Sequence, residues 1–272
     1  MQQASRLRAA GKAASFGAEI GKMCFLFGDV RSPLDETLVI VEQTVHAQLA
    51  AVVDQCLHLG SLSLEHVLFL FRDDAQRQYR IHDFMEWKDN RAAAEEGEEN
   101  EGDDGDDAAE EADTVARLPV SDFLTALELD AGIGDAVTAK AEALRTDKLR
   151  RHALAAQLTE TMTTDEYLEY AALRQASFTY KKGKKFRDWL GISGLADSDT
   201  TDVLGFLAWE MVGLLVQASL AVRREFQSGD AAPEFAARPL RFQPDRIFDC
   251  PWQPDAREPL LPVHVREAAR RI

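Results

Sequence analysis

The chain has 272 residues, of which 46% are hydrophobic, and a formal net charge of −16. This length allows one large domain or two small ones, and the hydrophobic content is sufficient to bury a core. Twelve acidic and no basic residues lie between Glu95 and Asp113, and the rest of the chain has 35 acidic and 31 basic residues. The net charge therefore belongs mostly to one segment, and the folded part is nearly balanced.

The composition also excludes several kinds of site. The three cysteines, Cys24, Cys56 and Cys250, are far apart and form no CxxC pair, which argues against zinc or dithiol redox chemistry and favours a reducing compartment. The start of the chain shows no apolar region typical of a signal sequence. The longest apolar run, 204–222, is interrupted by Glu210, so we do not expect it to span a membrane.

A short and a long helix are predicted first. The short helix spans 17–28. Ser32 as N-cap, followed by Pro33 and Asp35, starts the long helix, which ends at Gly60. Apolar residues of the long helix recur every three or four positions, which places them on one face. Those expected to form the pairing core are Leu38, Val41, Val45, Leu49 and Val52.

Two further helices are expected at 64–72 and 75–88. The order of short, long and short helix is the plan of the histone fold, which we assign with its extra C-terminal helix to residues 15–91. A histone fold buries its apolar faces only by packing against a second fold across the long helices. The sequence should therefore contain a second copy, or the protein needs a partner chain.

The middle of the chain is predicted to connect two folded parts. Residues 92–115 are too acidic to form a core, and we expect a disordered linker. A solvating spacer is one role for it, and a contact for basic histone tails or a mimic of the charge of DNA is the alternative. Residues 116–180 form a connecting helical region, in which Thr163 and Glu166 match a capping box before a helix at 167–178.

The last third of the chain repeats the plan of the first. Helices are predicted at 184–190, 201–226 and 263–272, with a proline-rich insertion at 228–262 before the last of them. We assign residues 181–272 to a second histone fold. The predicted fold class is all-α, with two tandem histone folds forming an intramolecular pair. The pairing core expected on the second long helix consists of Leu204, Leu207, Met211 and Leu215.

Several stretches resemble a known family. The first half, with EIGKMCFLFGDVRSPLDETLVIVEQTV, EHVLFLFRDD and FMEWKDNR, is similar to the histone fold that a small TATA-binding-protein-associated factor shares with the third suppressor-of-Ty proteins. Similar to the latter alone are DEYLEYAALRQASFTYKKGKKFRDWLG and DVLGFLAWEMV, and PLLPVHVREAARRI resembles the third helix of their second fold. Those proteins are the tandem-histone-fold subunits of the SAGA transcriptional coactivator.

The resemblance has several implications. It implies a nuclear, non-enzymatic protein without cofactors, whose two folds pair within one chain. It also implies association with other histone-fold and scaffold subunits of a SAGA-type complex. The function implied is to engage TATA-binding protein and to bring it to promoters of RNA polymerase II genes.

The stretch RQASFTYKKGKKFRDW interleaves basic and aromatic residues, which often indicates nucleic-acid binding. Here we expect its aromatic residues to pack in the second fold instead; they are Phe178, Tyr180, Phe186 and Trp189. For the lysines two interpretations stay open, a solvated helix start or a contact with protein or phosphate. The candidate partner-binding lysines are Lys181, Lys182, Lys184 and Lys185.

Glu210 is the fifth candidate for partner binding. It lies three residues after Leu207 and four before Leu214, on or beside the apolar face of the long helix. Burying a carboxylate without a partner destabilises the folded state by on the order of several kcal/mol. Glu210 therefore pairs internally, reaches the rim of the fold, or faces a basic partner such as TATA-binding protein.

Other functions have less support. The six histidines show no metal-ligand spacing and no catalytic or nucleotide-binding motif occurs, so we expect neither a metal site nor an enzyme. A histone-fold DNA-binding protein is one alternative. Arg31 is, however, the only basic residue in the first loop of the first fold, and the matching loop SGLADSDTTD is acidic, so we expect at most weak direct DNA contact. An acidic histone chaperone is the other alternative.

Overall fold

The computed structural model describes residues 15–96, 146, 149–150, 153, 155–227 and 258–272. The regular structure in this described part is helical, which confirms the predicted all-α class. The chain divides into two compact units, one made of residues 1–67 and 149–272 and the other of residues 68–148. Three predicted regions lie wholly or largely outside the described residues: the linker beyond Glu96, the connecting region up to residue 148, and the insertion from 228 to 257.

The first histone fold consists of α2 (Gly17–Leu26), the long α3 (Asp35–Leu59) and α4 (Leu64–Leu70). The extra helix, α5 (Ala75–Glu96), lies in the second unit. Gly60 follows α3 with a φ of 134°, a backbone conformation that favours glycine, and this confirms the predicted helix end.

The predicted start of α3 is wrong. The N-cap residue is Leu34, which provides no side-chain cap, rather than Ser32. The N–H of Leu38 donates to the carbonyl oxygen of Leu34 at 3.0 Å. The later start places Asp35 and Glu36 in the first turn, where their charges complement the helix dipole.

The predicted end of the first fold is also wrong. We expected disorder from residue 92, but α5 continues to Glu96. The added residues are three alanines and two glutamates, all strong helix formers, so the helix does not end where the acidic composition begins.

The second fold contains α9 (Gly183–Leu190), α10 (Ser198–Gln227) and α11 (Pro262–Arg271), and α8 (Thr164–Arg174) precedes it. The capping box is confirmed, because Thr163 Oγ1 accepts from the N–H of Glu166 and the Glu166 carboxylate accepts from the N–H of Thr163. The helix predicted at 167–178 ends earlier, at Arg174, where the chain turns toward α9.

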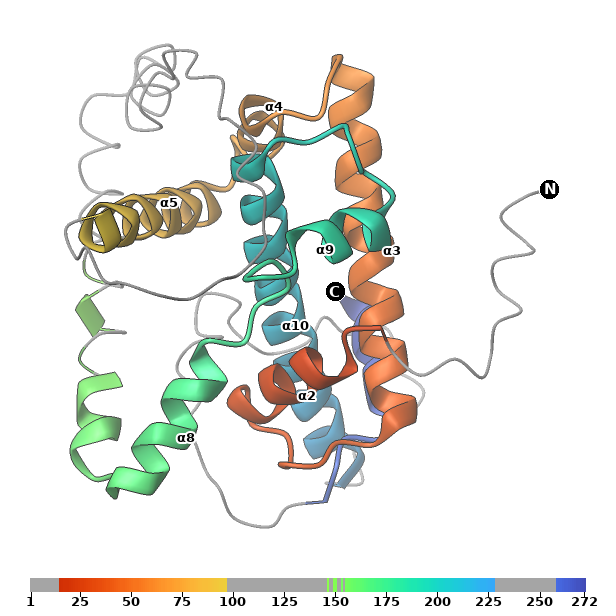
Figure 1. Ribbon diagram of the computed structural model, residues 1–272. Coiled ribbons are helices and arrows are strands. Elements are labelled where there is room, and N and C mark those ends of the chain that lie inside the picture. Colours follow the sequence, from red (N-terminus) through yellow and green to blue (C-terminus); the bar gives the residue numbers. More distant parts are fainter. Residues whose placement is uncertain (1–14, 97–145, 147–148, 151–152, 154, 228–257) are drawn as a thin grey trace. The chain divides into compact units, whose positions relative to one another are not determined.

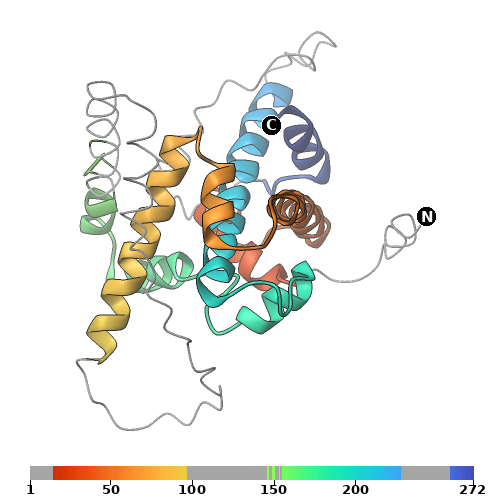
Figure 2. The same ribbon diagram turned by 90° about the horizontal axis from the view of Figure 1, so that it is seen from above.

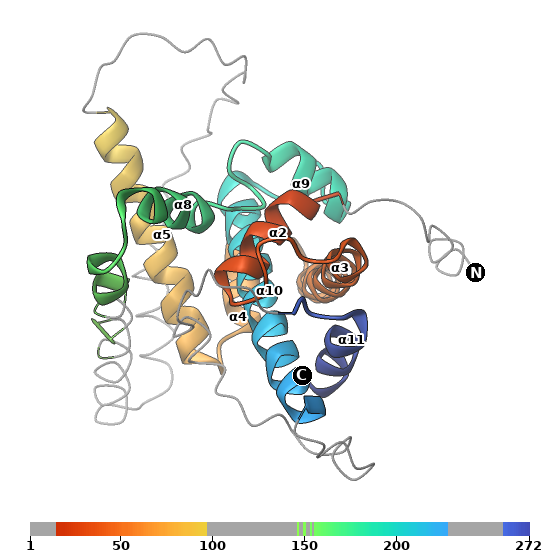
Figure 3. The same ribbon diagram turned by 90° about the horizontal axis from the view of Figure 1, so that it is seen from below.

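The two folds pack against each other through their long helices. α10 contacts α3, α2, α9 and α11, and α3 contacts α9 and α11 (Figure 1). Viewed from above and below, α11 lies on one side of α3 and α10, and α9 lies on the other (Figures 2 and 3). Each fold thus covers apolar surface of the other, as the paired plan requires.

The residues expected in the pairing core differ in burial. Val52 and Met211 are half-buried, and their neighbours Val53 and Val212 are buried instead. On each long helix, the side chain buried against the neighbouring helices is thus one residue later than the sequence predicted at this position. The expected core residues that are buried are Leu38, Val41, Val45, Leu49, Leu204, Leu207 and Leu215.

α10 is the one helix in the described part that is long and apolar enough to cross a membrane by length and composition. Within its most apolar 18-residue window, 72% is buried inside the structure. Burial of this extent is what a core helix shows, and α10 contacts four other helices.

Candidate protein-interaction surface

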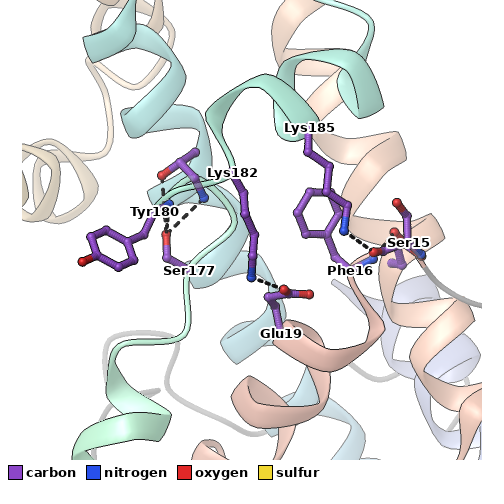
Figure 4. Close-up of polar contacts among 9 residues, drawn as sticks. Ser15, Phe16, Glu19, Ser177, Tyr180, Lys182 and Lys185 are labelled. Atoms are coloured by element: carbon purple, nitrogen blue, oxygen red, sulfur yellow. Dashed lines mark hydrogen bonds and ion pairs between the residues drawn. The ribbon is translucent and has the colours of Figure 1, made fainter. Parts of the chain in front are cut away.

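The lysine-rich stretch forms a tight turn between α8 and α9 (Figure 4). Ser177 Oγ accepts hydrogen bonds from the N–H groups of Thr179 and Tyr180, at 3.1 and 3.3 Å. The N–H of Lys182 donates to the carbonyl oxygen of Thr179 at 2.8 Å. Thr179 also lies against α10 so closely that a Cβ atom added at Gly205 would be 2.4 Å from its Cγ2. The backbone of this turn is therefore fixed by local hydrogen bonds and by packing.

Two of the four candidate lysines contact the first fold. Lys182 Nζ donates to the carboxylate of Glu19 on α2, and Lys185 Nζ donates to the carbonyl oxygen of Ser15 at 2.7 Å (Figure 4). Lys185 Nζ also lies 4.4 Å from the centre of the Phe16 ring, a cation–π distance. These two ammonium groups are engaged within the chain.

The contact with Lys182 changes the ionisation of Glu19. Burial alone would raise the pKa of Glu19, but the hydrogen bond from Lys182 and the charges of Lys182 and Lys185 outweigh it and hold the pKa below 4.5. The lowered pKa favours the carboxylate form in the folded state. Its stabilising contribution is present above pH 4.5 and is lost as the pH falls through the lowered pKa.

Lys182→Glu is expected to destabilise the protein by roughly 1–3 kcal/mol, because it places a second carboxylate beside the largely buried Glu19. Adding Glu19→Lys to the same chain should restore most of the loss. Chemical denaturation of the single and double variants measures this. Lys184→Glu, which changes an exposed lysine two residues further along the chain, in α9, is the control and should shift stability by less than about 0.5 kcal/mol. A double variant no more stable than Lys182→Glu would contradict the pairing.

Lys181 and Lys184 are both exposed; Lys185 is exposed as well, but its ammonium group contacts Ser15 and Phe16. Lys181 has a φ of 55°, in the left-handed region that non-glycine residues rarely adopt. Its Nζ lies 5.8 Å from the centre of the Tyr180 ring. These two lysines are accessible to a partner, and a role in binding stays a prediction.

The aromatic residues of the stretch also divide. Phe178 and Phe186 are fully buried, and their rings cluster with Trp189 and with Phe16 of the first half. The ring centre of Phe16 is 5.2 Å from that of Phe178 and 5.3 Å from that of Trp189. Tyr180 is 53% exposed and points away from this cluster (Figure 4), so the expectation that it packs in the second fold is wrong.

Glu42 is a residue that the sequence analysis missed. It is 8% exposed on α3, and its carboxylate accepts from the N–H groups of Ser15 and Phe16 at 2.8 and 3.0 Å. These are donors at the start of α2, so Glu42 acts as a cap from another helix. The sequence did offer one indication: Glu42 directly follows Val41, a residue of the apolar stripe, and a carboxylate buried at such a position needs hydrogen-bond donors.

Glu210 is buried, with 6% of its surface exposed. The structure therefore places it on the covered side of α10, and its carboxylate does not lack a partner within the chain. Its role in partner binding stays a prediction.

The described residues contain no group of three or more His, Cys, Asp or Glu side chains that could hold a metal ion. Cys24 and Cys56 are buried. Burial raises the pKa of both thiols, that of Cys56 to about 11, which disfavours the nucleophilic thiolate. Both side chains serve as core residues.

This arrangement defines a class of protein: a histone-fold protein whose two helix–long helix–helix units pack together in one chain. Residues 14–100 match the family model described as transcription initiation factor IID, 18kD subunit, which agrees with the resemblance seen in the first half.

Curated relatives extend the match over nearly the whole chain. SAGA complex subunit Spt3 of Schizosaccharomyces pombe is 32% identical, with 96% of this chain and 91% of the relative covered. SAGA complex subunit SPT3 of Saccharomyces cerevisiae is 28% identical, and Protein SPT3 of Kluyveromyces lactis is 30% identical; each match covers 94% of this chain and 90% of the relative. The chain belongs to the Spt3 family.

Proposed function

We propose that this protein is a non-enzymatic subunit of a SAGA-type transcription coactivator. In this role it acts in the nucleus, engages TATA-binding protein and helps to deliver it to promoters of RNA polymerase II genes. Its other partners are histone-fold and scaffold subunits of the same complex. The observation that carries the proposal is the similarity to relatives named SAGA complex subunits over more than nine-tenths of the chain.

The arrangement of the two folds supports a role in protein interaction. The pairing surface of each fold is occupied by the other fold, so a partner would bind outside the α3–α10 contact. The exposed Lys181 lies on a turn held by hydrogen bonds to Ser177 Oγ, and the exposed Lys184 lies in α9, so a fixed backbone limits the entropy lost on binding. We propose Lys181 and Lys184 as candidate contacts for TATA-binding protein; Glu210, which is 6% exposed, is a further candidate that binding would have to uncover.

Affinity purification of the tagged full chain from nuclear extract tests the proposal. Other SAGA subunits should copurify, and TATA-binding protein should be enriched with them. Lys184→Glu is expected to lower the recovery of TATA-binding protein by roughly threefold to fivefold at low salt, as for an exposed charge at an interface. The parent chain and the Lys184→Glu variant should recover equal amounts of the SAGA subunits.

Lys22→Glu is the matched control, because Lys22 is an exposed lysine on α2 and the substitution changes the net charge equally.

Calorimetry with purified TATA-binding protein then shows whether the contact is direct. Glu210→Gln tests the other candidate without changing the shape of a buried side chain. Absence of SAGA subunits from the purified material would overturn the proposed function. Equal effects of Lys184→Glu and Lys22→Glu would remove the lysine from the contact.

A further inference from the structure

The C-terminal segment, Glu258–Ile272, is hydrogen-bonded to the first fold through one backbone residue. The N–H of Leu260 donates to Asp29 Oδ1 at 3.0 Å, and its carbonyl oxygen accepts from Thr37 Oγ1 at 2.7 Å. Leu260 itself is 1% exposed. We call Asp29, Thr37 and Leu260 the latch. It joins the loop before α3 and the first turn of α3 to the residues that precede α11.

Beyond the latch, the segment is a small element at the edge of the pair (Figure 3). Val265 and Ala268 of α11 are fully buried, and α11 contacts α10 and α3. Its outer side is open, with Val263 and Ile272 each 48% exposed. A ten-residue helix with one buried face contributes much less apolar burial than the long helices beneath it. Such elements open at lower free energy than the core.

Burying the carboxylate of Asp29 in the closed latch costs electrostatic free energy. The side chain is 3% exposed, and Oδ2 has no hydrogen-bond partner. Burial raises the pKa of Asp29, although hydrogen bonds from the N–H groups of Leu260 and Val30 and the charge of Arg223 act in the opposite direction. An asparagine would keep the acceptor oxygen and remove the charge. The closed latch therefore carries the cost of burying a charge, which an amide of the same shape would not carry.

We propose that Glu258–Ile272 is a strap that opens separately from the rest of the histone-fold pair, and that the buried carboxylate of Asp29 sets how often it opens. Opening hydrates Asp29 and leaves α2, α3, α9 and α10 packed on one another. The inference does not depend on the identity of any partner.

The charged and titratable groups around the latch give the strap opposite responses to pH. Arg223 on α10 is near Asp29 and donates to the carbonyl oxygen of Glu258 at 2.6 Å, and the buried Cys24 faces Asp29 from α2. On α11, His264 Nδ1 accepts from the N–H of Leu261 at 3.1 Å. Burial, and then the charge of Arg223, lower the pKa of His264.

The sign of each response follows from these shifts. The raised pKa of Asp29 stabilises the closed strap below pH 3.8, and this contribution is lost as the pH rises through the raised value. The lowered pKa of His264 stabilises the closed strap above pH 6.5, and this contribution is lost as the pH falls through the lowered value. Removing the Asp29 charge should abolish the first response and leave the second.

Hydrogen exchange of the full chain, read by mass spectrometry at peptide resolution, tests the proposal. Amides of α11 should exchange faster than amides in the middle of α3 and α10. Asp29→Asn should slow α11 exchange by roughly tenfold, because it removes the burial cost of a carboxylate whose Oδ2 lacks a hydrogen bond. Thr37→Val should speed it by roughly threefold to tenfold, because the carbonyl oxygen of Leu260 loses its donor.

Asp54→Asn is the matched control, because it makes the same substitution at an exposed position of α3. It should leave α11 exchange unchanged. Equal protection of α11 and α3 in the parent protein would show that the strap opens only with the whole fold, and would overturn the proposal. So would an Asp29→Asn variant whose α11 exchange matches that of Asp54→Asn. The opposite directions expected for Asp29→Asn and Thr37→Val separate a change in the latch from general destabilisation.

Discussion

The first histone fold, expressed alone as residues 1–91, is expected to be insoluble or molten. Val41, Val45 and Leu49 on α3 are each 1% exposed or less, and α3 packs against α9, α10 and α11 of the second fold. Exposing one such side chain to water costs roughly 1.5–3 kcal/mol. Losing three or four of them removes an amount comparable to the whole stability of a domain, which is about 5–15 kcal/mol.

Far-ultraviolet and near-ultraviolet circular dichroism, together with thermal melting of the fragment, measure this effect. We expect helical signal without fixed side-chain packing and without a cooperative transition. Adding residues 149–272 as a second chain should restore cooperative melting, since it supplies α9, α10 and α11. A monomeric 1–91 fragment that melts cooperatively would show that the first fold does not need the second.

Local signals in the sequence were sufficient to predict where several helices begin and end. Gly60 ends α3 and Thr163 begins α8, because a glycine in the left-handed region and a capping box act within a few residues of the helix end. The predicted N-cap at Ser32 failed where two local signals competed. The helix starts after Leu34, where the negative charges of Asp35 and Glu36 stabilise its first turn through the helix dipole, and Ser32 is not used as a cap.

Contacts between distant parts of the chain could not be predicted in this way. Glu42 caps α2 through Phe16, which is 26 residues away in sequence, and Asp29 accepts a hydrogen bond from the N–H of Leu260, which is 231 residues away. In sequence both are carboxylates within or next to apolar stretches, and spacing alone does not identify their partners. Such residues can be marked as needing a buried donor. Which donor they find depends on how the two folds pack.

The lysine-rich stretch shows the same limit at short range. Lys182 and Lys185 donate hydrogen bonds to the first fold, although the four lysines look equivalent in sequence and Lys185 is exposed, as Lys181 and Lys184 are. Lys181 lies in the turn that Ser177 holds before α9, whereas Lys184 and Lys185 lie in α9, where successive side chains leave the helix axis in different directions. A non-glycine residue with positive φ in this turn was not predictable from composition.

Phe186→Ala is expected to destabilise the protein by about 3–5 kcal/mol, which corresponds to a fall in melting temperature of roughly 6–20 °C for a chain of this size. Phe186 is fully buried, with its ring centre 6.0 Å from that of Phe178 and 5.7 Å from that of Trp189. The cavity would open where the start of the first fold, through Phe16, meets the second fold. Both folds should therefore lose stability in one transition.

Tyr180→Ala is the matched comparison, because it removes an aromatic ring of similar size from the same stretch at a position that is 53% exposed. It should change stability by less than about 0.5 kcal/mol. Differential scanning calorimetry of the two variants beside the parent separates the core role of one ring from the surface position of the other. If both substitutions lowered the melting temperature equally, Tyr180 would be part of the core and the outward turn at Ser177 would be incorrect. If neither did, the aromatic cluster would not hold the two folds together.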